Sequence, residues 1–87
     1  MNEHLQQLEI SPERFARWRE AAERLGEDGG PLRTELRGVL ADPSRHMLRR
    51  AARAARYAER QTTGDLALIA NAVATELEND AEGPANV

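Results

Sequence analysis

The sequence predicts an all-α protein: a small bundle of four helices over about residues 12–25, 31–41, 43–61 and 65–79. Two observations lead to this fold class. Apolar side chains recur at helical spacing in each segment, and the junctions between the segments carry helix-capping residues, proline or glycine. One domain over residues 1–79 is expected in this 87-residue chain, because a second hydrophobic core would need about twice the length.

The first helix has the clearest predicted boundaries. Ser11 is a typical N-cap, Pro12 suits the first helical position, and Gly26 is expected to end the helix. Its core side is predicted from four residues that share one arc of the helix: Phe15, Trp18, Ala22 and Leu25.

The second and third helices are separated by a short turn. The glycine-rich segment 26–30 is expected to be a loop, and its acids Glu27 and Asp28 would repel a phosphate group. Pro31 opens the second helix, and Asp42 and Pro43 are expected to be the N-cap and first residue of the third. The core stripe of the second helix is predicted to be Leu32, Leu36, Val39 and Leu40.

The last helix and the two ends of the chain complete the prediction. Thr62 and Asp65 are spaced as a capping box for the last helix. A short helical turn is expected over residues 3–9, and residues 80–87 are expected to be a disordered acidic tail with almost no core-forming side chains. The core stripe of the last helix is predicted to be Leu66, Ile69, Ala70, Val73 and Leu77.

Charge is distributed unevenly along the chain. The net charge is -3, and all twelve basic residues are arginine. Residues 29–61 hold eight arginines and three acids, whereas residues 62–87 hold five acids and no arginine. A basic middle therefore lies between acidic ends.

The third predicted helix has two chemically different sides. Its core side is rich in alanine, which would let other helices approach closely, so this helix is expected to be the central one. Its opposite side carries five arginines within about 80° of arc at 3.6 residues per turn. The alanine-rich side is Met47, Leu48, Ala51, Ala52, Ala54, Ala55 and Ala58; the arginines are Arg45, Arg49, Arg53, Arg56 and Arg60; the flanking residues are Arg50, His46 and Tyr57.

Something is expected to compensate so many like charges, because arginines at i, i+4 spacing repel each other by a few tenths of a kcal/mol per pair. Three compensations are open: solvent with counterions, the acidic C-terminal segment, or another molecule. The acids of that segment are Glu76, Glu78, Asp80 and Glu82.

We expect a small non-enzymatic regulatory or adaptor protein that binds an acidic protein surface through the arginines and their flanking residues. A DNA- or RNA-binding protein that uses the same helix is the alternative. Residues 36–50 have the helix, turn, helix order of a helix-turn-helix, although the usual glycine is missing from the turn. The overall acidity favours a protein partner. A structural or assembly subunit is the third hypothesis, and Leu68, which points away from the core stripe, favours a homodimer through the last helix.

Other classes are excluded by missing motifs. His4 and His46 have no metal-ligand spacing around them, and Ser11 and Ser44 are explained by positions at helix starts, so no metal, cofactor or catalytic residue is expected. The longest weakly polar run has nine residues, too short to cross a bilayer, and the N-terminus does not read as a signal peptide. A soluble, cytoplasmic protein is expected.

Overall fold

The computed structural model describes residues 10–82, which form four α-helices and one short 3-10 turn. The predicted all-α, four-helix fold is confirmed. The turn expected over residues 3–9 and positions 83–87 of the expected tail lie outside the described residues. In chain order the elements are α1 (Pro12–Leu25), η2 (Gly26–Gly29), α2 (Leu32–Ala41), α3 (Arg45–Gln61) and α4 (Gly64–Glu82).

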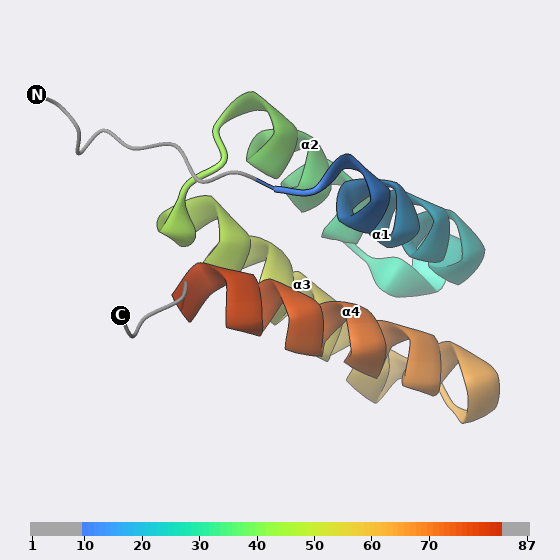
Figure 1. The fold of residues 1–87 in the computed structure, drawn as a ribbon. Helices are drawn as coiled ribbons and strands as arrows, with labels where there is room; N and C mark the ends of the chain where they lie inside the picture. The colour runs from blue at the N-terminus through green and yellow to red at the C-terminus, as the bar shows by residue number, and fades with distance from the viewer. Residues whose placement is uncertain (1–9, 83–87) are drawn as a thin grey trace, which may run out of the picture.

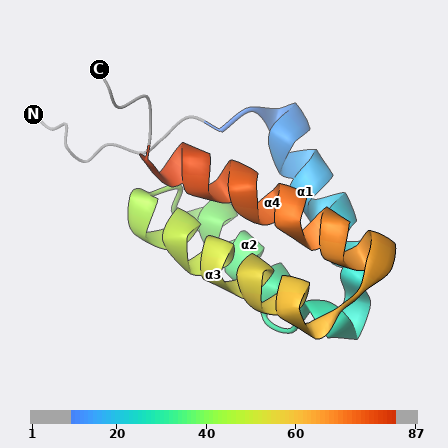
Figure 2. The same cartoon turned by 90° about the horizontal axis from the view of Figure 1, so that it is seen from below.

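The four helices are arranged in two layers (Figure 1). One layer contains α1 and α2, and the other contains α3 and α4, which run side by side (Figures 1 and 2). The contact between α3 and α4 is the most extensive of any pair of elements. Only Thr62 and Thr63 connect these two helices, so they form an antiparallel hairpin.

The core combines a few large side chains with many alanines. Trp18, Leu32 and Leu48 are among the largest fully buried side chains. The predicted alanine side of α3 is buried, apart from the partly exposed Met47, and it packs mainly against α4. Small side chains on both helices allow their backbones to approach closely. The buried alanines of the two helices are Ala51, Ala52, Ala54, Ala55 and Ala58 on α3 and Ala70, Ala74 and Ala81 on α4.

The ends of α1 lie where the sequence predicted them. The Ser11 hydroxyl accepts a hydrogen bond from the backbone N–H of Arg14 at 3.3 Å, and Pro12 occupies the first turn. Gly26 ends the helix with φ at +56°, in the left-handed region that glycine adopts at little cost.

The predicted start of α3 is wrong by two residues. The helix begins at Arg45, and its N-cap is Ser44, whose hydroxyl accepts from the backbone N–H of Met47 at 3.2 Å. Asp42 instead closes α2, because its backbone N–H donates to the carbonyl oxygen of Gly38 at 2.9 Å. Proline disfavours a helical conformation of the residue before it, which accounts for Asp42 lying outside both helices.

The last helix is longer than predicted. It runs three residues beyond Asn79 to Glu82, and Ala81, four residues after Leu77, continues the buried stripe. The Thr62 hydroxyl donates to the carbonyl oxygen of Ala58 at 2.8 Å, which places it at the end of α3 instead of in a capping box for α4.

The predicted burial of Leu40 is also wrong. Its side chain is 65% exposed, because Leu32, Leu36 and Val39 occupy the buried side of α2 and Leu40 lies at the border of that stripe. Leu68 on α4 is 67% exposed, as its position opposite the core stripe predicted.

Candidate functional site

The five arginines predicted to share one side of α3 lie on the surface turned away from the buried alanines. We call them the arginine face. It extends for about four helical turns, or roughly 22 Å at 1.5 Å per residue. Arg56, at the edge toward α4, is partly buried, and the other four members are exposed: Arg45, Arg49, Arg53 and Arg60.

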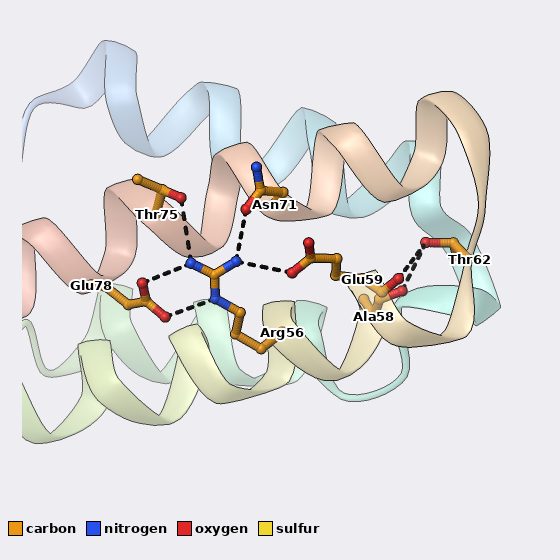
Figure 3. A network of polar contacts seen from close by, with 7 residues as sticks. All are labelled: Arg56, Ala58, Glu59, Thr62, Asn71, Thr75 and Glu78. Carbon is orange, nitrogen blue, oxygen red and sulfur yellow. Dashed lines mark hydrogen bonds and ion pairs between the residues drawn. The ribbon is translucent and has the colours of Figure 1, made fainter.

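Arg56 is fixed by a network of polar contacts that joins α3 to α4 (Figure 3). Its Nε and Nη2 atoms donate to the two carboxylate oxygens of Glu78, each at 2.8 Å. Its Nη1 atom donates to Glu59 at 2.9 Å and to the amide oxygen of Asn71 at 2.7 Å, and Nη2 also lies 3.4 Å from the Thr75 hydroxyl. The pair of hydrogen bonds between Arg56 and Glu78 is the strong form of an arginine–carboxylate interaction.

The charges in this network stabilise one another. The pKa of Arg56 is raised above its ordinary value by the hydrogen bonds to Glu78 and then to Glu59, against a smaller opposing effect of burial. The hydrogen bond from Arg56 lowers the pKa of Glu78. Arg56 therefore has an internal anionic partner and contributes to the α3–α4 contact.

Arg50 is neutralised at the opposite edge of α3. Its Nε and Nη2 atoms donate to the two carboxylate oxygens of Glu35 on α2, at 3.1 and 3.2 Å. The Glu35 side chain is only 16% exposed, so the pair is partly shielded from water. This contact was not predicted from the sequence, because the two residues belong to different helices.

The middle of the arginine face remains open. Within residues 10–82, none of its four exposed arginines forms an ion pair. Three of them, Arg49, Arg53 and Arg60, line a groove of about 330 Å³ between α3 and α4, together with Arg56. The groove exists because Ala52 and the predicted tail residue Ala81 present only methyl groups there. Its acidic lining residues are Glu78 and Glu82.

Two of the four acids of the C-terminal segment, Glu76 and Asp80, face α1, whereas Glu78 and Glu82 line the groove beside the arginine face. Glu76 accepts from Arg17 at 2.9 Å and from the indole N–H of Trp18 at 2.8 Å, and Asp80 lies 3.2 Å from Arg14. Burial acts to raise the pKa of Glu76, but the hydrogen bonds from Trp18 and Arg17 outweigh it and the pKa is lowered. Among residues 10–82, the acidic segment forms an ion pair with the arginine face only at Arg56.

Two of the three predicted flanking residues, His46 and Tyr57, lie beside the exposed arginines. His46 is exposed and lines a shallow surface hollow with Arg50 and Arg53. Tyr57 is 47% exposed, and its ring lies against Gly30, where an added Cβ atom would be 3.3 Å from the ring. Both side chains are therefore within reach of a molecule bound to Arg53.

Residues 10–82 contain no group of three or more histidine, cysteine, aspartate or glutamate side chains arranged to hold a metal ion. In that same range no helix has the length and apolar character needed to span a bilayer. Comparisons of the whole chain with protein-family models, curated proteins and solved structures gave no match.

Proposed function

We propose that this protein is a small non-enzymatic regulatory or adaptor protein that binds an acidic segment of another protein through the arginine face. One observation carries the proposal: within residues 10–82, the edges of the basic surface of α3 form ion pairs, at Arg50 and Arg56, whereas the arginines at its centre form none. The contact residues are the four exposed arginines, with His46 and Tyr57 beside them: Arg45, Arg49, Arg53 and Arg60.

The spacing of these arginines suits carboxylates that repeat once per helical turn. Arg45, Arg49 and Arg53 are successive i, i+4 neighbours, so their Cα atoms lie about 6 Å apart along the helix axis. Each guanidinium offers several N–H groups in a planar fork that matches a carboxylate. An acidic helix or extended acidic peptide laid along α3 would therefore meet a row of donors on one narrow surface.

Acids along the border of this surface favour a protein partner over a nucleic acid. Glu78 and Glu82 line the groove beside the exposed arginines, and the chain as a whole carries a charge of -3. A duplex is wider than one helix, and its phosphates would approach these carboxylates. A protein segment can place its acids opposite the arginines alone.

Nucleic-acid binding is the second candidate, and one observation favours it. Tyr57 and His46 present exposed rings next to Arg53, which is the combination that single-stranded nucleic acids use for stacking and phosphate contact. A third candidate, an assembly subunit, has support from the exposed Leu68 on α4, which a second copy of the chain would cover. A cytoplasmic location belongs to the same proposal.

Affinity purification from the native cell, with and without nuclease, tests the proposal. A protein partner should be retained after nuclease treatment and lost as salt is raised, because exposed charge pairs are screened. The double variant Arg49→Glu/Arg53→Glu should lose the partner with an unchanged circular dichroism spectrum. Arg24→Glu on α1 is the control for a charge reversal at another exposed arginine. Retention of the same partner by the double variant would exclude the arginine face as the site.

The nucleic-acid candidate has its own test. The assay is an electrophoretic shift with duplex and single-stranded probes. A low salt concentration of ~50 mM is used because phosphate contacts are strongest there. A shift that Arg53→Glu and Tyr57→Ala both remove would support this candidate. Absence of any shift under these conditions would eliminate it.

A further inference from the structure

A second surface, independent of the arginine face, lies between α1 and α2. Two adjoining hollows of about 290 and 340 Å³ share Phe15, Arg19 and Leu40 and so form one groove along the two helices. The groove and the arginine face have no residue in common, and they belong to different layers of the bundle (Figure 1).

The floor of this groove is apolar and firmly supported. Phe15 is half-buried and packs edge-on against Trp18, with ring centroids 6.1 Å apart. Leu40, 65% exposed, is one of the few large apolar side chains of the described residues that are left open to solvent. Exposed apolar side chains gathered in a hollow can serve as a contact site. Ile10, Pro12, Ala16 and Pro43 also line it, whereas the apolar lining residues Ala22, Leu36 and Val39 are buried beneath it.

The rim of the groove is basic. Arg19 extends from α1, and Arg33 and Arg37 extend from α2. Glu23 is the one acid that lines the groove, and it lies 3.7 Å from Arg33. For Arg19 and Arg37, no ion pair is recorded with any residue from 10 to 82. An apolar floor between basic edges is complementary to an apolar stripe between acidic edges.

We propose that this groove binds an amphipathic helix with acidic edges, supplied by a partner protein. The groove follows α2 from Arg33 to the Pro43 turn, about 15 Å at 1.5 Å per residue, which is the length of about ten helical residues. The bound helix would place apolar residues at i, i+3 or i+4, and i+7 over Phe15 and Leu40. Its acids would face Arg19 on one side and Arg37 on the other.

The test uses two designed peptides with the full chain. Both are capped fifteen-residue helices with leucine at i, i+3, i+4 and i+7; one carries glutamate on both edges of the leucine stripe and the other carries lysine. Fluorescence anisotropy should show the glutamate peptide binding at least tenfold more tightly than the lysine peptide. Equal binding of the two peptides, or no binding of either, would overturn the proposal.

Variants locate the bound peptide. Leu40→Ser should weaken binding of the glutamate peptide about tenfold, since it removes the exposed apolar contact without touching the core. Arg19→Glu/Arg37→Glu should weaken binding by at least as much, whereas Arg49→Glu/Arg53→Glu on α3 should leave it unchanged. The opposite pattern would mean that the peptide binds the arginine face, which would reject the groove and leave the proposed function standing.

Two other possible occupants of the groove, a second copy of the chain and residues 1–9, are tested with the Leu40→Ser variant and a shortened chain. If the chain sediments as a dimer and Leu40→Ser makes it monomeric, a second copy occupies the groove and the proposal is wrong. Residues 1–9 carry Leu5 and Leu8 between Glu3 and Glu9, and they join the chain at the groove residue Ile10. If removal of residues 1–8 tightens peptide binding tenfold or more, this segment is the occupant and a separate partner is excluded.

Discussion

The guanidinium of Arg56 and the carboxylate of Glu78 form a two-bond ion pair, with both N–O distances at 2.8 Å, across the α3–α4 contact. Arg49 lies on the same side of α3, two helical turns before Arg56, and forms no ion pair within the described range. Two arginines of one helix thus have different surroundings. Arg56 is bound to acids of the fold, whereas Arg49 is exposed and belongs to the surface proposed for binding.

This difference can be measured by removing each charge in turn. Arg56→Met should lower the free energy of unfolding by about 1 kcal/mol, a modest value because the side chain is 34% exposed and its pairs are screened by water. Arg49→Met should change it by less than about 0.5 kcal/mol, as exposed substitutions usually do. Urea unfolding followed by circular dichroism measures both variants. Equal costs for the two would contradict the assignment of separate roles.

The bond from Trp18 to Glu76 should be worth more to the fold than most surface contacts. Trp18 is 1% exposed, so Glu76→Ala would leave its indole N–H without an acceptor in a buried position. The expected loss in the free energy of unfolding is about 1–3 kcal/mol. In a Trp18→Phe background, which lacks the donor, the same substitution should cost clearly less. Glu20→Ala, an exposed acid on α1, is the control and should be nearly neutral.

Acid should lower the free energy of unfolding, and the carboxyls of Glu78 and Asp80 should contribute to this change with opposite signs. The pKa of Glu78 is lowered by its bond from Arg56, so its stabilising effect is complete above its ordinary pKa of 4.5 and is lost as pH falls through the lower folded value. Burial raises the pKa of Asp80, so its protonation favours the folded state. Between about pH 5 and pH 3, Glu78→Gln should make the fall in stability shallower, and Asp80→Asn should make it steeper. Urea unfolding at a series of pH values measures both slopes, and a common direction of change would refute the prediction.

Two glycines allow backbone strain to be separated from side-chain contact. Gly26 and Gly30 have nearly equal φ angles of +56° and +57°, but an added Cβ at Gly26 meets nothing within 4 Å, whereas at Gly30 it meets the Tyr57 ring at 3.3 Å. Gly26→Ala should therefore cost about 1–3 kcal/mol from the backbone conformation alone, because side chains rarely adopt φ +56° with ψ -135°. Gly30→Ala should cost more, and the excess should disappear in a Tyr57→Ala background. Thermal unfolding of the four variants checks this; an excess that persists without the ring would point to strain at Gly30 instead.

Helical periodicity was sufficient to predict the fold class, because each of the four helices has its own apolar stripe. Boundaries were predicted well where one residue type had one possible role, as at Ser11 and Gly26. They were predicted wrongly where two nearby residues compete: Asp42 and Ser44 are both good N-caps, and the local sequence does not decide between them.

The division of the arginine face could not be read from the sequence. Helical spacing gives the direction of each arginine around α3. It does not give the position along a neighbouring helix at which an acidic side chain comes close to that arginine. Glu35 and Glu78 are 15 and 22 residues from the arginines they pair with. The bond from Trp18 to Glu76 was missed for the same reason, although a buried indole N–H always calls for an acceptor.

The position of Trp18 has a practical consequence for watching this protein unfold. It is the only tryptophan in the chain, and it lies on α1 with its indole N–H bonded to Glu76 of α4. Its fluorescence therefore reports the docking of α1, whereas the ellipticity at 222 nm reports the helices together. If α1 detaches before the α3–α4 hairpin melts, the two signals will change at different denaturant concentrations, and the bundle will be seen to open in two stages.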